Sequence, residues 1–411
     1  MNEVNPNKLG AAQYDRHPDE RALRASRGTL TVATQGSAMT QFETDSIVAG
    51  ISRWAACESP SADAAAVNRM IDIVAADCAD APVAVERLAG RQGCADMLVL
   101  RAGPRNGQPH ALVLSHLDTV HPLGTLADRL PVRVEGDRLY GPGVMDMKGG
   151  AYMVLVALKE ATRADALTRP TVHLFPQDEE IGSPGSRPLI EEHGRGAAHV
   201  LVTEPARPGG RVVTARRGSG RYEVRLRGIP AHSGTAHEAG RSAIREAAHQ
   251  ILAVEALNDA ERGINATVGL MKGGSAVNTV PEHASFMLDV RMSDPADAER
   301  LDRCIRALKA REPEVKITVD GRITRPPYAK SQAIADLHAR VQAIGAELGL
   351  DLADIALAGG GSDGNFTASM GIPTLDGLGI EGFGAHTLHE YALIPSIPVR
   401  TALLYHLITR L

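Results

Sequence analysis

The stretch LVLSHLDTVHP, residues 112–122, decides the fold because an apolar run passes directly into polar and ionisable residues. The run from Leu112 to Leu114 predicts a buried strand. His116 and Asp118 stand two residues apart, and the period of two in a strand places both side chains on one face. Strands of an open α/β sheet end at the functional crevice, so this stretch predicts a site at the edge of such a sheet.

Apolar strands and amphipathic helices alternate around this stretch, which predicts a mostly parallel α/β sheet flanked by helices. The expected strands are MLVLRAGP (97–104), ALVLSHLDTV (111–120), TVHLFPQDEE (171–180) and HVLVTEP (199–205). The expected helices lie within FETDSIVAGISRWAACES (42–59), SADAAAVNRMIDIVAADCADA (61–81) and GAYMVLVALKEATR (150–163).

The pattern changes near residue 216, where a second unit begins. Strands are expected in RYEVRLRGIP (221–230), ATVGLMKGG (266–274), ASFMLDVRM (284–292) and VKITVDGRIT (315–324), with helices at 241–256 and within 295–313. This β-α-β-β-α-β order predicts a ferredoxin-like, open-faced α/β sandwich. We therefore expect residues 216–326 to be inserted into a split domain formed by 41–215 and 327–411, with 1–40 as an N-terminal extension.

The composition is that of a globular enzyme. The chain has 411 residues, of which 44% are hydrophobic and 23% charged, and this length predicts two domains. A net charge of −5 and 3% aromatic residues argue against a nucleic-acid partner. No apolar run approaches the roughly 20 residues of a membrane span, and the N-terminus lacks an apolar signal core. Four scattered cysteines match no zinc pattern and suggest buried free thiols, so we expect a cytoplasmic protein.

Five segments carry acidic or imidazole groups at expected strand ends or loops. They are His116 with Asp118, Asp146 in LYGPGVMDMKGG (139–150), Asp178–Glu180 in FPQDEEIGSPGS (175–186), Glu204, and His386, His389 and Glu390 in GFGAHTLHEYA (382–392). Imidazole and carboxylate ligands without thiolate suit zinc, manganese or cobalt. The five segments therefore predict one site that holds one or two divalent metal ions.

Taken in this order, SHLDTV, GPGVMDMKGG, DEEIGSPGS, TEP, GIPAHSG and GAHTLHEY resemble the M20 metallopeptidase superfamily from about residue 45 to the C-terminus. The most similar group is that of glutamate carboxypeptidase, acetylornithine deacetylase and succinyl-diaminopimelate desuccinylase. The resemblance implies that His116 and Glu204 bind one metal ion, that Glu180 and His386 bind a second, and that Asp146 bridges both.

The resemblance also assigns roles beside the metal ions. Glu179 is implied as the general base for a shared water, whose pKa two cations lower from about 15.7 toward about 7. Asp118 is implied to orient His116 by accepting its other ring N–H, and the bond from Asp146 to Met147 is expected to be cis. His232 in GIPAHSG resembles a histidine on the inserted domain that reaches across a homodimer interface to stabilise the oxyanion.

Substrate anchors are expected from six further positions. Asn278 and Arg291 match positions that bind substrate oxygens in related enzymes, and Arg325 is expected to hold a carboxylate through a bidentate fork. Gly360 and Ser362 belong to GGGSD (359–363), a glycine loop that is expected to approach the ligand. Two features depart from glutamate carboxypeptidases: TARRGSG (214–220) adds basic residues, which brings Arg217 among the candidates, and Ser-Asp-Gly (362–364) replaces the usual Thr-Asp-Ala.

The expected activity is metal-dependent hydrolysis of a carbon–nitrogen bond in a small carboxylate-bearing molecule, such as an N-acyl amino acid or a dipeptide-like amide. One alternative is an aminohydrolase that releases ammonia from an aromatic amino acid of the nitroanthranilate type. Another is a dimeric binding protein without catalysis. GPGVMDMKGG lacks the GxxxxGK[ST] order of a phosphate loop, and no serine sits in a GxSxG elbow.

Overall fold

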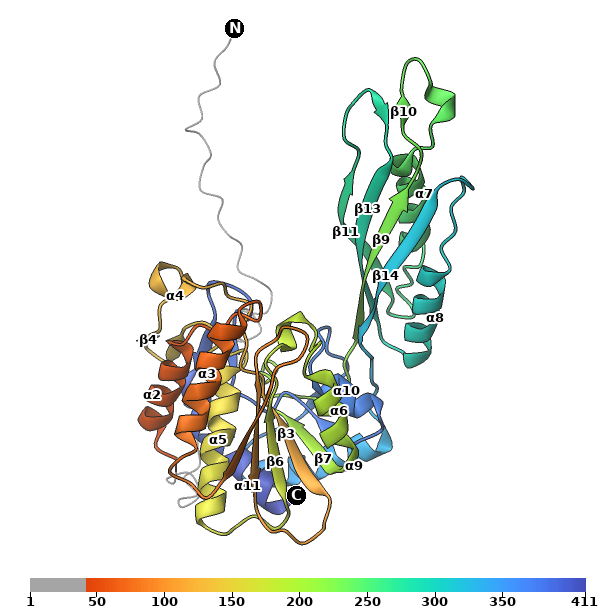
Figure 1. Cartoon of the computed structure of the whole chain (residues 1–411). Helices are drawn as coiled ribbons and strands as arrows, with labels where there is room; N and C mark the ends of the chain where they lie inside the picture. The colour runs from red at the N-terminus through yellow and green to blue at the C-terminus, as the bar shows by residue number, and fades with distance from the viewer. Residues whose placement is uncertain (1–41) are drawn as a thin grey trace.

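The computed structural model describes residues 42–411, so the extension expected over 1–40 lies outside the described residues. The chain forms a larger body around a six-stranded sheet and a smaller one, the inserted body, that spans β9 to β14 (Figure 1). Both connections between the two bodies lie side by side near the ends of β9 and β14 (Figure 1). The predicted α/β fold class is confirmed.

The six-stranded sheet is mostly parallel, as predicted. Its spatial order is β1 (Ala84–Leu88), β2 (Met97–Ala102), β6 (Thr171–Phe175), β3 (His110–Leu114), β7 (Ala197–Val202) and β16 (Thr374–Leu375). The last four strands are parallel to one another, whereas β2 pairs antiparallel with both β1 and β6. Residues 111–114 of β3 are buried on both faces, which explains the continuous apolar run of the sequence.

Helices cover both faces of this sheet because the apolar side chains of each strand alternate between two cores. Val113 packs into the core that is shared with α2 (Thr44–Ala55), α3 (Ala64–Asp77), α5 (Lys148–Arg163), α9 (Gln332–Glu347) and α11 (Ile397–Arg410). Leu112 and Leu114 pack on the opposite face with residues of α6 (Arg187–Arg195) and α10 (Gly364–Ser369). The carboxyl ends of the parallel strands are left free to carry a site.

The inserted body confirms the predicted β-α-β-β-α-β order. It contains β9 (Gly218–Arg227), α7 (Ala243–Glu255), β11 (Asn265–Gly273), β13 (His283–Met292), α8 (Pro295–Arg306) and β14 (Lys316–Arg325). The antiparallel sheet has the order β11-β13-β9-β14, and α7 and α8 cover one of its faces (Figure 1). Because β9 begins and β14 ends at the connections, we propose the domain division 41–215 with 327–411 and 216–326.

Short elements complete the described chain. They are α4 (Thr125–Asp128), β4 (Arg133–Glu135), β5 (Arg138–Tyr140), β8 (Val212–Val213), β10 (Ala231–His232), β12 (Thr279–Val280), β15 (Asp354–Ile355), β17 (Gly382–Phe383), β18 (Tyr391–Leu393), and the 3-10 helices η1 (Glu179–Ile181), η2 (His237–Ala239) and η3 (Ile394–Ser396). The sheet β17-β18-β5-β4 is the important one, because β18 pairs with β5 and brings residues 382–393 beside the segment that contains Asp146.

Two expectations from the composition, the absence of a membrane span and the burial of the cysteines, can be compared with the structure. No helix within residues 42–411 is long and apolar enough to cross a membrane. The four cysteines are free, but the expectation of buried thiols holds fully only for Cys78. Cys304 is exposed because Leu301 and Ile305 turn the apolar face of α8 to the core and leave Cys304 on the outer face.

Candidate active site

His116 and Asp118 lie just beyond β3, which corrects the expectation that the strand itself holds them. β3 ends at Leu114. The backbone N–H groups of Ser115 and Leu117 still donate to the carbonyl oxygens of Leu174 and Pro176, each over 3.2 Å, so the chain stays extended.

His116 is buried and presents its two ring nitrogens to different groups. Its Nδ1 lies 3.0 Å from the carbonyl oxygen of Asp118 and 3.5 Å from the Asp118 carboxylate. Its Nε2 lies 3.2 Å from Asp146 Oδ1 and 3.8 Å from Glu204 Oε1. An imidazole whose Nδ1 is engaged in this way leaves Nε2 free to bind a cation.

Asp118 also holds the acidic segment in place. Its carboxylate accepts hydrogen bonds from the backbone N–H groups of Glu179 and Glu180, each over 3.1 Å. One buried carboxylate therefore fixes His116 and the two acidic residues relative to each other.

His386 reaches the opposite side of Asp146. Its Nε2 lies 3.3 Å from Asp146 Oδ2 and 3.0 Å from Glu180 Oε2. The backbone of His386 has φ +64, a left-handed conformation in the tight turn closed by the Thr387 N–H and the Gly384 carbonyl. The two oxygens of Asp146 thus face two histidines, as a carboxylate between two metal ions would.

Asp146 sits in the turn before α5, and the peptide bond from Asp146 to Met147 is cis, as expected. The turn is held by Glu390, a residue to which the sequence assigns no role. The Glu390 carboxylate accepts hydrogen bonds from the backbone N–H groups of Gly143 (3.1 Å), Met145 (2.9 Å) and Asp146 (3.1 Å).

A test of donor chemistry shows that the cluster fits divalent metal ions. The ligand atoms of His116, Asp146 and Glu180 lie within 4.8 Å of one another, and so do those of His116, Glu179 and Glu204. The donors are imidazole nitrogen and carboxylate oxygen alone, the set that suits zinc, manganese or cobalt.

The electrostatics of the cluster favour positive charge at both histidines. Burial lowers the pKa of His116, but hydrogen bonds with Asp118 and Asp146 outweigh it and raise the pKa well above its usual value. Hydrogen bonds with Asp146 and Glu180 raise the pKa of His386 to about 11. Burial, together with the charge of Asp146, raises the pKa of Glu204 to about 8. Several carboxylates lie close together in the site, and a bound cation would stabilise their negative charges.

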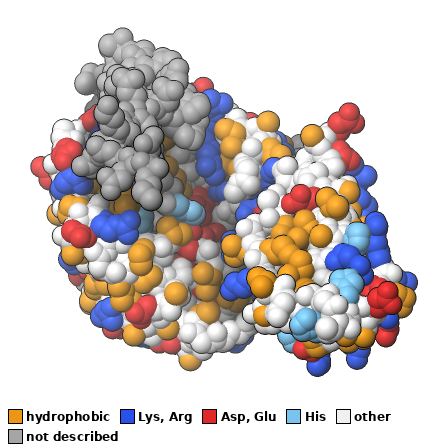
Figure 2. Space-filling model, turned by 90° about the horizontal axis from the view of Figure 1, so that it is seen from above, with side chains coloured by type: hydrophobic (Ala, Val, Ile, Leu, Met, Phe, Trp, Pro, Cys, Tyr) orange, Lys and Arg blue, Asp and Glu red, His pale blue; other side chains and the backbone are white. Residues whose placement is uncertain are grey.

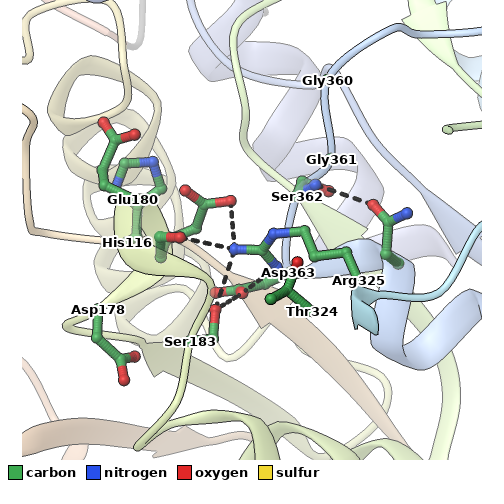
Figure 3. Close-up of polar contacts among 12 residues, drawn as sticks. His116, Asp178, Glu180, Ser183, Thr324, Arg325, Gly360, Gly361, Ser362 and Asp363 are labelled. Atoms are coloured by element: carbon green, nitrogen blue, oxygen red, sulfur yellow. Dashed lines mark hydrogen bonds and ion pairs between the residues drawn. The ribbon is translucent and has the colours of Figure 1, made fainter. Parts of the chain in front are cut away.

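Glu179 starts η1 and is 9% exposed. Burial raises the pKa of its carboxyl well above the usual value, and the charge of Arg325 opposes this rise. Arg325 Nη2 lies 2.7 Å from Glu179 Oε1. Figure 3 shows the Arg325 guanidinium among acidic and hydroxyl groups close to His116 and Glu180.

The glycine loop, residues 359–363, is fixed by hydrogen bonds with buried charged side chains. The Ser362 hydroxyl donates to Asp376 Oδ2 over 2.5 Å, and Arg216 Nε lies 2.7 Å from the same oxygen. Arg216 Nη1 donates to the Gly360 carbonyl over 3.0 Å. Of the two loop positions expected to approach a ligand, Ser362 is buried, whereas Gly360 has open space where a Cβ would stand.

The remaining predicted residues lie on the inserted body. Arg291 Nε is 2.7 Å from Asp289, and Arg217 donates to Asn265 over 2.7 Å. His232 and Asn278 are exposed, and the Asn278 carbonyl accepts from the backbone N–H of residue 233 over 3.0 Å. Figure 1 shows β10, which carries His232, at the end of the inserted body farthest from the six-stranded sheet. The structure therefore does not bring these two residues to the histidine–carboxylate cluster of their own chain.

Comparisons with known proteins find matches over most of the chain. The model of peptidase family M20/M25/M40 matches residues 112–410. Carboxypeptidase G2 of Pseudomonas sp. (strain RS-16) is 33% identical over 310 residues, which are 74% of each chain. Succinyl-diaminopimelate desuccinylase of Sphingopyxis alaskensis is 28% identical over 328 residues, 75% of this chain and 82% of that protein. The crystal structure of aminopeptidase PepT from Bacillus cereus superposes with a TM-score of 0.72 at 21% identity, over 89% of this chain and 98% of that one.

Proposed function

The chain belongs to peptidase family M20/M25/M40 and is a metal-dependent hydrolase of carbon–nitrogen bonds, and from this premise we propose that it cleaves the amide bond of a small carboxylate-bearing substrate. An N-acyl amino acid or a dipeptide-like amide is the substrate class. The observation that carries the proposal is the Asp146 carboxylate, whose two oxygens face His116 and His386 with Glu179 nearby.

His116, Asp146 and Glu204 would hold one metal ion, and Asp146, Glu180 and His386 would hold the second. Divalent ions bound there would supply an electrophile for the scissile carbonyl and lower the pKa of a water molecule beside Glu179. Asp118 keeps His116 oriented, because it faces Nδ1 and leaves Nε2 directed into the cluster.

Glu179 is the proposed general base. Its carboxylate would take a proton from the attacking water and deliver it to the leaving nitrogen. Burial raises the pKa of Glu179 above its usual value, which favours the protonated form that donates to the leaving nitrogen.

A homodimer would complete the site. The inserted body exposes large apolar side chains at Ile244, Leu252, Leu270, Met271, Val277 and Met287, and Figure 2 shows orange side chains gathered on this part of the surface. Its strand β11 is at the edge of the sheet, a position that favours pairing with another copy. Because His232 lies far from the cluster of its own chain, we propose that His232 and Asn278 act in the site of the partner subunit.

Arg217 and Arg291 are the proposed anchors for the substrate carboxylate. Both belong to the end of the inserted body nearest the connections, and each side chain has one acidic or amide neighbour. Arg217 contacts Asn265, which pairs with Arg291 in the sheet, so the two arginines are neighbours. Burial and the charge of Arg291 both lower the pKa of Arg217. An anion between them would be favoured by both charges.

The proposal is tested by loading the protein separately with zinc, manganese and cobalt and supplying a panel of N-acyl amino acids and dipeptides. Release of a free amino acid in at least one metal form is the expected result. Release of ammonia without an amino acid would instead indicate an aminohydrolase and would contradict the proposal.

A further inference from the structure

Arg325 connects the two bodies of the molecule at the proposed catalytic base. It is the last residue of β14 in the inserted body, yet its side chain is 5% exposed and enters the larger body. Nη2 lies 2.7 Å from Glu179 Oε1 and donates to the Glu179 carbonyl, also over 2.7 Å. Nη1 lies 2.9 Å from Asp363 Oδ1. Figure 3 shows the guanidinium at the centre of these contacts.

An irregularity in β14 directs this side chain. Ile323 pairs with Gly220 and Arg325 pairs with Ser219, so Thr324 is an extra residue opposite β9. The Thr324 hydroxyl donates to the Ser219 carbonyl over 3.1 Å and fixes the irregularity. A β-bulge bends its strand and re-aims the side chains beside it, which turns the end of β14 toward the larger body.

The glycine loop leaves the space that Arg325 needs. A Cβ at Gly361 would lie 2.4 Å from Arg325 Cδ, so any larger residue there would displace the arginine side chain. The Ser183 hydroxyl accepts from Arg325 Nη2 over 3.1 Å and donates to Asp363. The loop residue Gly361 and these two polar groups together fix one orientation of the guanidinium.

From these contacts we propose that Arg325 is a positioning residue that holds the Glu179 carboxylate and, through β14, ties the placement of Glu179 to the inserted body. The inference rests on the proposed role of Glu179 as general base. It differs from the expectation that Arg325 binds the substrate carboxylate, since both Nη atoms already face groups of the chain itself.

Arg187 provides a matched control. Its guanidinium lies 4.9 Å from the centre of the Phe366 ring, and that of Arg325 lies 5.1 Å from the same ring. Arg187 pairs with Glu191 over 2.7 Å instead of with Glu179. Replacing either arginine by methionine therefore removes one charge over Phe366, but only Arg325→Met removes the contact with the base.

The experiment measures kcat and KM of the metal-loaded variants on an N-acyl amino acid and on the same compound with its carboxylate converted to an amide. We expect Arg325→Met to lower kcat by about 10²-fold on both substrates with KM within about threefold of wild type. Arg325→Lys should recover part of the loss, Arg187→Met should behave as wild type, and in a Glu179→Ala background Arg325→Met should cause no further loss.

Three results would overturn the inference. A rise in KM with unchanged kcat, seen only with the carboxylate substrate, would make Arg325 a substrate anchor. An equal loss in the Glu179→Ala background would separate Arg325 from the base. If Arg325→Met does not fold, Gly361→Ala displaces the same side chain and must lower kcat likewise; wild-type kcat in that variant overturns the inference. If the wild-type protein hydrolyses neither substrate, the proposed function is contradicted, and so is the inference that rests on it. The wild-type rate alone identifies this outcome.

Discussion

Replacing Glu390 by glutamine tests whether the turn that carries Asp146 depends on one buried carboxylate. Glu390 is 1% exposed. Oε1 accepts the N–H groups of Met145 and Asp146, whereas Oε2 accepts that of Gly143 and lies 2.9 Å from His121 Nε2. Glutamine keeps the shape of the side chain but offers only one acceptor oxygen, so one of these two pairs must face an NH₂ group.

The magnitude follows from the bonds lost. A hydrogen bond to a charged group contributes about 1.5–3 kcal/mol. An NH₂ group can donate to His121 Nε2 but cannot accept from a backbone N–H, so one or two bonds are lost and the free energy of unfolding should fall by about 1.5–6 kcal/mol. The released turn also lets Asp146 move, and losing a support of this kind typically weakens metal affinity about 10–100-fold.

Thermal melting and metal titration of Glu390→Gln measure both effects, with the exposed neighbour His389 changed to alanine as the control. We expect a clear drop in Tm and in metal affinity for Glu390→Gln and neither for His389→Ala. A Glu390→Gln protein that melts and binds metal like wild type would refute the assignment of Glu390 as the support of Asp146.

Metal affinity should rise with pH, because Glu204 with a pKa of about 8 and His386 with a pKa of about 11 hold protons near neutral pH and must release them to bind a cation. Calorimetric titration in buffers of different ionisation heat should show proton release on binding, and its absence would contradict this reading. Glu179→Gln should retain bound metal while kcat falls about 10²–10⁴-fold; a variant with wild-type kcat would remove Glu179 from the mechanism. His232→Ala and Glu179→Ala should each be nearly inactive, yet subunits mixed from the two should recover about a quarter of the activity if each site uses both chains. No recovery in a verified mixed dimer would show that His232 does not act in the site of the partner subunit.

The sequence was most informative where local pattern and chemistry coincide. Apolar runs followed by His116 or Glu204 marked strand ends, because strands buried on both faces must be apolar and the carboxyl ends of parallel strands meet at one edge. The alternation in β9 likewise revealed a half-exposed strand of a separate sheet. Such features depend on a few neighbouring residues, so the fold class and the set of candidate ligands could be predicted.

Apart from Asp118, the supports of the site could not be predicted, because they join segments that are distant in the sequence. Glu390 accepts N–H groups 244 to 247 residues away, and a backbone donor leaves no mark in the sequence. Arg325 reaches Glu179, 146 residues away, only because a bulge at Thr324 re-aims it, and the register of β14 against β9 sets that bulge. For the same reason the glycine loop 359–363 was expected to approach the ligand, whereas its Gly361 makes room for an arginine.

Anomalous diffraction from crystals of the manganese- or zinc-loaded protein would show whether the residues around Asp146 hold a pair of metal ions. We expect two peaks about 3.5–4 Å apart on either side of the Asp146 carboxylate, one beside His116 and Glu204 and the other beside Glu180 and His386. Saturating metal with no peak at Asp146, or peaks only at other residues, would contradict this expectation.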